Sequence, residues 1–410
     1  MEKVQFQLEA TLPELQDLHD KGLFTKLEIN QITKRRTALE TSLVRQKTRK
    51  EDYFAYAEYE INLERLRKVR WKRLGYEENP PPPSASTYSI PRRVLYILKR
   101  ATVKFPSDLA VWLAYVEFAA REGMRKVVLK GLTNALQHHP QSPTIYLLLS
   151  YHHIHPNEPF PRGVIPSSSS LTLPLAPEPS ASFSIDGTSS ARTTLLLGLR
   201  TCPKSHALWT EYIKLELGWV EVLRRRWSAL GLEGGDKTKT AEISLDGGEG
   251  SFGPDGEDAR KAILAGQLVT QALRSALETI EANADGMVFR ENLLAVLRVY
   301  PSPLRQIGLD LLHEDLSRVE QAGGKEGARA KLLNLTRRLY EQPYGSTSAG
   351  DLALEGIELV EELGRIGKEI RKTAKGRDNA WTDIAGSWLH QQARDVRISA
   401  EMVSVCVCSR

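Results

Sequence analysis

The sequence predicts an all-α protein whose helices stack as repeats into a solenoid, with disordered insertions between some of them. Apolar residues recur every three or four positions along most of the chain, and neither sustained period-two alternation nor an Asn-Gly hairpin turn occurs. A proline followed six residues later by an aromatic residue occurs at Pro106, Pro140 and Pro203. Hydrophobic residues make up 41% of the 410 residues, which is enough to form a core and excludes wholesale disorder.

Residues 1–50 are predicted to form an N-terminal helical arm. The apolar residues of a first helix lie three or four positions apart on one face: Val4, Leu8, Leu12, Leu15 and Leu18. Lys21-Gly22 ends this helix, and a second helix is expected from Thr25, paired with Glu28 in a capping box, through Leu43. The apolar face of the first helix, with Phe24, either caps the solenoid or docks in the groove of a partner.

Residues 51–155 and 191–230 are predicted to contain the clearest repeats. Each proline is preceded five residues earlier by a small residue, Ala101, Ala135 or Gly198, which lets two helices approach closely. Aromatic residues three and six or seven positions apart share one helix face. We therefore assign the following aromatic residues to the repeat core: Tyr53, Tyr56, Trp112, Tyr115, Phe118, Tyr146, Trp209 and Tyr212.

The other segments differ in composition. Residues 80–83 are four prolines that form a stiff spacer, residues 156–190 are a Pro/Ser-rich insertion that we expect to be disordered, and residues 231–258 are a flexible Gly-rich acidic loop. Residues 259–340 are expected to hold degenerate repeats, with helices at 262–281, 287–300 and 304–319. Residues 341–410 are expected to form a divergent helical C-terminus in which Trp381 and Trp388 mark one more unit.

Positive charge is concentrated near the N-terminus. Residues 1–130 contain 25 Lys+Arg and 17 Asp+Glu, a net charge of +8, although the whole chain carries only +5. Six cations lie within nine residues: Arg65, Arg67, Lys68, Arg70, Lys72 and Arg73. Helical spacing predicts that Leu66 and Val69 lie on the buried side of this run. The run is either a surface that contacts RNA phosphates or a solvated helix that faces protein.

Three patterns could indicate a chemical site, but for each of them a structural or incidental explanation is stronger. Gly248-x-Gly250-x-x-Gly253 follows an acidic loop instead of a buried strand, so we expect no cofactor there. The histidines at positions 138, 139, 152, 153 and 155 are predicted to interact with helix C-termini, with a zinc site as the alternative. Cys406-x-Cys408 alone cannot complete a tetrahedral metal site. We expect no catalytic residue, no metal and no enzyme activity.

The repeat pattern resembles a known type. Arg100-Ala101, Pro106 and the run from Trp112 to Phe118 are similar to the half-a-TPR (HAT) repeat, a TPR-like helix pair found in RNA-processing particles.

The N-terminal motifs resemble one family more specifically, that of U3 small nucleolar RNA-associated protein 6. The similar segments follow in the same order: Leu12-Pro13-Glu14-Leu15, Gly22-Leu23-Phe24, Glu28-Ile29, Lys50-Glu51-Asp52-Tyr53, Tyr59-Glu60-Ile61-Asn62-Leu63 and Arg73-Leu74-Gly75-Tyr76. Members of that family carry further repeats, so the resemblance implies a truncated C-terminus here.

This resemblance implies a non-catalytic scaffold of the nucleolar small-subunit processome. Its partners would be the WD40-propeller subunits of the UTP-B subcomplex and the particle of U3 RNA and pre-ribosomal RNA, and its role would be 18S ribosomal RNA maturation. No membrane segment and no small-molecule substrate are expected. The alternatives are a HAT scaffold of a splicing or 3′-end-processing particle, and an enzyme embedded in helices.

Overall fold

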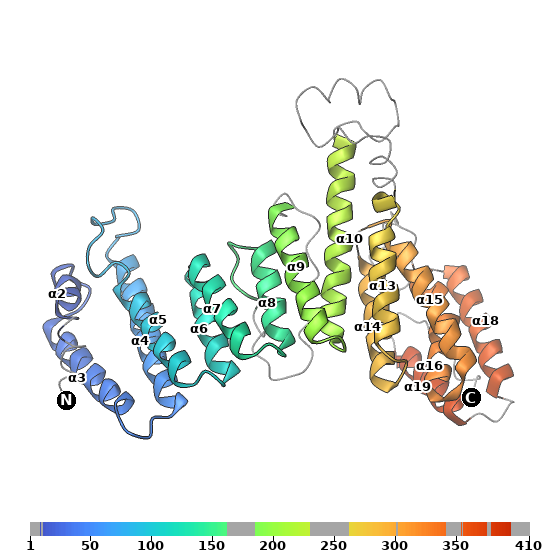
Figure 1. Cartoon of the computed structure of the whole chain (residues 1–410), viewed down its shortest axis with the longest axis horizontal. Coiled ribbons are helices and arrows are strands. Elements are labelled where there is room, and N and C mark those ends of the chain that lie inside the picture. The colour runs from blue at the N-terminus through green and yellow to red at the C-terminus, as the bar shows by residue number, and fades with distance from the viewer. Residues whose placement is uncertain are drawn as a thin grey trace. The chain divides into compact units, whose positions relative to one another are not determined.

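The computed structural model of the chain describes residues 9, 11–161, 185–229, 262–300, 302–341, 354, 356–374 and 379–394. Every regular element among these residues is a helix, which confirms the predicted all-α fold (Figure 1). The chain divides into two compact units, Met1–Leu171 and Thr172–Arg410. Within the described part, no helix combines the length and apolar character needed to cross a membrane.

The first unit contains seven described helices longer than one turn, which lie side by side in sequence order in Figure 1. They are α2 (Leu12–Asp20), α3 (Lys26–Leu43), α4 (Lys50–Arg73), α5 (Ser89–Lys104), α6 (Leu109–Arg121), α7 (Arg125–His138) and α8 (Pro143–Ile154).

The second unit holds the remaining described helices. They are α9 (Ile185–Thr201), α10 (His206–Ala229), α13 (Gln267–Thr279), α14 (Ala284–Val299), α15 (Arg305–Ala322), α16 (Gly324–Leu335), α17 (Arg337–Tyr340), α18 (Gly356–Ala374) and α19 (Asn379–Arg394).

The N-terminal arm contains α2, which begins at Leu12 instead of near Val4, and α3, which covers almost the predicted range from Thr25 to Leu43. Gly22, at φ +67°, separates α2 from α3 in the left-handed conformation that favours glycine. The Thr25 side chain accepts the Glu28 N–H, and the Glu28 carboxylate accepts the Thr25 N–H, so the capping box is formed. Leu15 and Leu18 are buried, but Leu12 is 58% exposed, so its predicted place on the buried face is wrong. Val4 and Leu8 lie outside the described residues.

The repeats share one turn, which connects the second helix of a pair (helix B) to the first helix of the next (helix A). It is four residues long between α5 and α6, α7 and α8, and α9 and α10. The residue before each proline is disfavoured in helical conformation and ends the helix. The backbone N–H of this residue donates to the backbone carbonyl of the small residue four positions earlier. The distance is 2.8 Å in all three pairs: Phe105–Ala101, His139–Ala135 and Cys202–Gly198.

The connection from helix A to helix B has no fixed length. It comprises 15 residues between α4 and α5, 3 between α6 and α7, and 30 between α8 and α9. Helix α9 begins at Ile185, so the last residues of the segment 156–190 are helical instead of disordered. Residues 162–184 and the loop 231–258 lie outside the described residues.

The predicted degenerate repeats are helices at almost the expected positions, α13, α14 and α15. The turn between α13 and α14 is again four residues long, and the Ile280 N–H donates to the Ala276 carbonyl at 2.9 Å. Met287, fully buried, occupies the position that Trp112, Tyr146 and Trp209 hold in the other repeats. The turn geometry has therefore been retained here without its proline and aromatic residue.

Apolar side chains fill the space between neighbouring helices in each unit. Leu95 of α5 packs against the cluster formed by α6, α7 and α8, which places α5 next to this group. In the second unit, α16, α18 and α19 enclose a core around Trp381, which is 1% exposed, with Trp388 partly buried against it.

Candidate RNA- and partner-binding surface

The predicted spacing of six residues between proline and aromatic residue has a specific cause. The polar atom of each ring donates a hydrogen bond to the proline carbonyl: Trp112 Nε1 to Pro106 at 2.9 Å, Tyr146 Oη to Pro140 at 2.9 Å and Trp209 Nε1 to Pro203 at 2.8 Å. Each bond joins the start of a helix A to the turn that follows the preceding helix B. These rings are therefore structural, and their hydrogen-bonding atoms point into the repeat.

The other aromatic residues assigned to the core occupy the same helix faces. Tyr53, Tyr56 and Phe118 are buried, as are the three proline-linked rings, whereas Tyr115 and Tyr212 are half-buried. Tyr53 packs edge-on against Phe105, with ring centroids 6.0 Å apart. None of the eight is an exposed platform on which a base could stack.

Bidentate Arg–Glu pairs link helix B to helix A, and sequence reasoning missed them. Arg36 is fully buried and donates to both carboxylate oxygens of Glu60 at 2.7 and 2.8 Å. Arg192 and Glu216 form the same bidentate pair at 2.7 and 2.8 Å. In both cases the arginine lies 17 residues before the first repeat aromatic and the glutamate 7 residues after it. That repeated spacing is the signal that could have revealed the pairs.

The repeat that begins at Trp112 has no such pair, because neither position carries a charged residue. Leu95 and Ala119 stand where the arginine and the glutamate are expected, and Ala119 is buried. Replacing a buried ion pair by apolar residues avoids the desolvation of two charges. The repeat frame therefore accepts either a complete ion pair or none.

The basic run of α4 is divided between the interior and the surface. Arg67 donates to both oxygens of Glu64 at 2.7 and 2.6 Å, and Arg70 does the same to Glu28 at 2.9 and 2.6 Å. The Arg70 guanidinium also lies 4.9 Å from the centroid of the Phe24 ring. The hydrogen bonds from Arg70 and from the Thr25 N–H lower the pKa of Glu28 to about 2.

The remaining cations of the run, Arg65, Lys68, Lys72 and Arg73, are exposed. Leu66 and Val69 are 41% and 49% exposed, so the prediction that they face the core is wrong. Arg70 turns inward instead because α3 supplies the Glu28 carboxylate and the α2–α3 connection supplies the Leu23 carbonyl and the Phe24 ring, whereas Arg67 pairs within α4. These four cations point outward, and two of them also approach carboxylates, Lys68 at 3.7 Å from Glu122 and Lys72 at 3.8 Å from Glu77.

The histidines lie at the helix ends, as predicted, and the two at the end of α7 pack against α6 and the turn before it. His138 stacks on Trp112 with ring centroids 5.5 Å apart, and His139 Nε2 is 3.0 Å from the Pro106 carbonyl. Burial lowers the pKa of His152 and His153, which opposes the charged form that a helix C-terminus would favour. No group of three His, Cys, Asp or Glu side chains able to hold a metal occurs among the described residues. Cys406, Cys408 and residues 248–253 lie outside that part.

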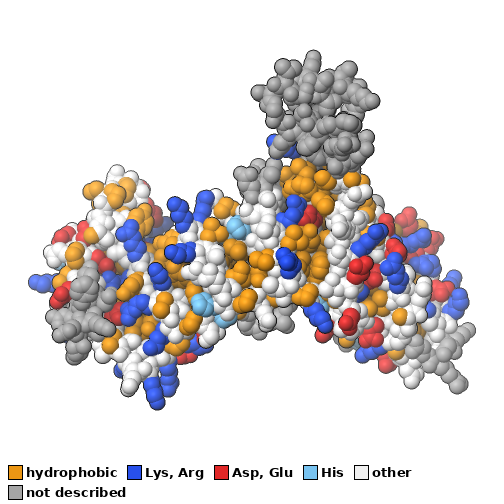
Figure 2. All heavy atoms as spheres, viewed as in Figure 1, with side chains coloured by type: hydrophobic (Ala, Val, Ile, Leu, Met, Phe, Trp, Pro, Cys, Tyr) orange, Lys and Arg blue, Asp and Glu red, His pale blue; other side chains and the backbone are white. Residues whose placement is uncertain are grey.

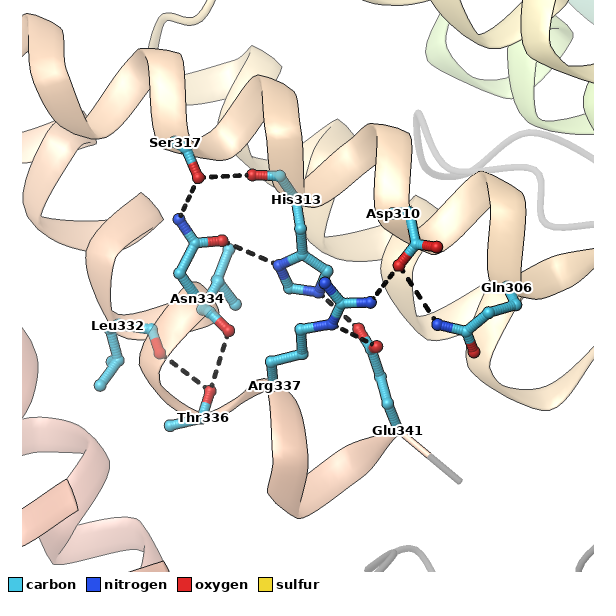
Figure 3. Close-up of polar contacts among 10 residues, drawn as sticks. Gln306, Asp310, His313, Ser317, Leu332, Asn334, Thr336, Arg337 and Glu341 are labelled. Atoms are coloured by element: carbon cyan, nitrogen blue, oxygen red, sulfur yellow. Dashed lines mark hydrogen bonds and ion pairs between the residues drawn. The ribbon is translucent and has the colours of Figure 1, made fainter. Parts of the chain in front are cut away.

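A buried polar network joins α15 to α16 and α17 (Figure 3). The two ring nitrogens of His313 contact Asn334 Oδ1, at 2.8 Å, and Glu341 Oε1. Arg337 donates to Glu341 at 2.7 Å and also pairs with Asp310. Burial alone would raise the pKa of Glu341, but the hydrogen bonds from His313 and Arg337 outweigh it and lower that pKa.

This network has no free nucleophile. The Ser317 hydroxyl in Figure 3 donates to the His313 backbone carbonyl at 2.8 Å instead of approaching the imidazole ring. Its contacts stabilise helix packing, and they do not form a nucleophile–base arrangement.

The paired helices and the recurring four-residue turns define a helical-repeat protein. A family model described as U3 small nucleolar RNA-associated protein 6 matches residues 8–93. The Schizosaccharomyces pombe protein of that name is 32% identical over 253 residues, which cover 62% of this chain and 45% of the relative. Homologues from human and mouse are each 26% identical over 299 residues, 73% of this chain and 41% of their own.

These matches confirm the resemblance to the U3 small nucleolar RNA-associated protein 6 family that the N-terminal motifs predicted. The chain spans less than half the length of these relatives.

Proposed function

We propose that this chain is a non-catalytic HAT-repeat scaffold of the U3-containing small-subunit processome in the nucleolus, where it supports pre-ribosomal RNA processing and 18S maturation. The names of its relatives associate them with U3 small nucleolar RNA. The proposed partners are WD40-propeller subunits of the UTP-B subcomplex and the particle that contains U3 RNA and pre-ribosomal RNA.

This proposal rests mainly on one observation: the polar residues of the family motifs make contacts between helices. Glu14 pairs with Arg36 at 2.9 Å and with Arg93 at 3.1 Å, and Glu60 pairs with Arg36. The Tyr76 hydroxyl donates to the Lys21 carbonyl at 3.1 Å. These motif residues therefore fix α2–α5 to one another. A family signature that consists of helix–helix contacts supports a scaffold, because its polar groups are not available for chemistry.

The exposed cations at the end of α4 are the part of this platform that we propose for partner contact. Arg65, Lys68, Lys72 and Arg73 lie within three turns of one helix, next to the connection from α4 to α5. Arg67 and Arg70 would contribute only by holding the helix in place.

Affinity purification of the tagged chain from nuclear extract, with mass spectrometry and RNA sequencing, tests the proposal. We expect propeller subunits together with U3 RNA, and we expect the protein partners to remain after nuclease treatment. The variant R65E/K68E/K72E/R73E should lose partners that the matched surface variant R318E/K325E/K368E/R371E retains. Recovery of splicing or polyadenylation factors instead would refute the processome assignment and favour the alternative particle.

A further inference from the structure

Helix α5 exposes a stripe of aromatic and basic side chains on its outward side. Its sequence contains five Lys and Arg residues and no Asp or Glu. Arg93 and Arg100 turn inward to pair with Glu14 and Glu40. Arg92 and Lys99 are exposed and form no ion pair within the described part of the chain.

Two tyrosines lie on the same stripe as these cations. Tyr88 is 61% exposed and Tyr96 is 44% exposed, in contrast to the buried aromatic residues of the repeat frame. At 3.6 residues per turn, positions 88, 92, 96, 99 and 103 fall within an arc of about 80°, and they extend about 22 Å along the helix. The stripe thus alternates aromatic and basic side chains from Tyr88 to Lys99 and ends in the exposed Val103.

A neighbouring arginine of α5 holds the Tyr96 ring in place. The Arg100 guanidinium lies 5.4 Å from its centroid, and Arg100 is itself fixed by two hydrogen bonds to Glu40 at 3.0 and 3.1 Å. An aromatic ring that is positioned before a ligand arrives loses less side-chain entropy on binding.

Helix α7 continues the basic surface in the next repeat. Lys126 and Lys130 lie 14 and 10 residues before Pro140, the positions that Arg92 and Tyr96 hold relative to Pro106. Both lysines are exposed, and α7, like α5, has no acidic residue. Figure 2 shows Lys and Arg side chains, with few acidic ones, over the part of the visible face that α6 and α7 occupy.

We propose that the outward stripes of α5 and α7 form a binding surface for single-stranded RNA. Tyr88 and Tyr96 would stack on bases, and Arg92, Lys99, Lys126 and Lys130 would contact phosphates. This inference rests on the proposed function, which it deepens by placing the RNA contact on the helix-B face instead of the basic run of α4.

Two features favour single-stranded RNA over an acidic peptide. Binding of a single strand combines exposed aromatic rings, on which bases stack, with cations that contact the backbone, and the stripe provides such rings at Tyr88 and Tyr96. Phosphates repeat along the strand, and the four cations likewise repeat along two helices without an interposed acidic residue on either. An acidic peptide would use the cations but would have no use for the two rings.

Fluorescence anisotropy of the purified full chain with a labelled 12-nucleotide oligouridine tests the surface at several salt concentrations. We expect Y88A/Y96A to weaken binding about 25-fold, fivefold per ring, without changing the salt dependence, and Y88F/Y96F to bind like the unmodified chain. We expect R92Q/K99Q/K126Q/K130Q to weaken binding and to reduce the slope of log K against log[salt] by about 3. The control R318Q/K325Q/K368Q/R371Q removes the same number of charges from the second unit and should bind normally.

Several results would overturn this assignment. They are no binding at low salt, an equal loss in the control variant, unchanged binding by Y88A/Y96A, or more effective competition by polyglutamate than by unlabelled RNA. The last result would identify an acidic protein segment as the occupant. Because the proposed function is tested by recovery of the particle from extract, the RNA surface can fail while the scaffold assignment holds.

Discussion

The Arg36 side chain is fully buried among carboxylates, which allows the cost of removing it to be estimated. It makes two hydrogen bonds to Glu60 and one to Glu14, at 2.7–2.9 Å. Its pKa is raised because the attraction of Glu60 and Glu14 outweighs the effect of burial. In the variant R36L, Glu60 would remain buried without its partner, while Glu14 would retain Arg93.

Breaking a buried ion pair by removing one partner costs about 3–5 kcal/mol. We therefore expect R36L to raise the equilibrium constant for local unfolding of α3 and α4 by roughly two to four orders of magnitude. The double variant R36L/E60A should recover most of this loss, since it reproduces the Leu95 and Ala119 combination that the chain already uses in another repeat.

Hydrogen exchange of the α3 and α4 amides, read by mass spectrometry, measures the loss of local stability in each variant. It does not assume that the whole chain unfolds in one step. Peptides from α18 and α19 serve as an internal control and should not change. A loss below about 1 kcal/mol for R36L, or a double variant as unstable as R36L, would refute the reasoning from the buried pair.

Three further predictions concern other contacts. W209F keeps most of the ring but removes the indole N–H that donates to the proline carbonyl, so hydrogen exchange should show a loss of about 1 kcal/mol in α10. G131A would place a Cβ 2.9 Å from an α6 side chain and should lower the stability of α7 by about 1–3 kcal/mol. At Gly364 an added Cβ meets no atom within 4 Å, so G364A should stabilise α18 by about 0.5–1 kcal/mol. Equal effects of the two variants in thermal melts would contradict the expected difference. Because the pKa of Glu341 is lowered by folding, its contribution is complete above its unfolded value near 4.5 and is lost as pH falls through the lower folded value. Acid unfolding of α15–α17 followed by hydrogen exchange should therefore lose part of its pH dependence in E341Q, and an unchanged acid transition would show that His313 and its neighbours do not depend on this carboxylate.

The repeat frame was predictable because its determinants are local. A proline that ends one helix and an aromatic residue six positions later both act on the same short turn, so Pro106 and Trp112 identify it without knowledge of any other segment. The capping box at Thr25 is local in the same way. Even where proline is absent, as before Met287, the periodicity still located the helices.

The surface of α4 could not be predicted because it depends on residues distant in the sequence. Periodicity alone places Leu66 and Val69 together on an apolar line, yet Arg70 takes the inward position because Glu28 lies 42 residues away in sequence but next to it in space. The exposed tyrosines of α5 were also missed. Nothing in the spacing of Tyr88 and Tyr96 distinguishes a surface ring from a core ring until the neighbouring helices are in place.

The contrast between the two kinds of connection determines where the chain accepts foreign sequence. The four-residue turns from helix B to helix A are clamped by the ring-to-proline hydrogen bond, so adding one residue between Lys104 and Leu109 should misalign every helix pair that follows in the first unit. The connections from helix A to helix B already vary from 3 to 30 residues. An epitope, a fluorescent reporter or a cross-linkable peptide placed within residues 78–82 should therefore leave the stacked helices undisturbed, which makes this connection a practical position from which to label the protein inside its particle.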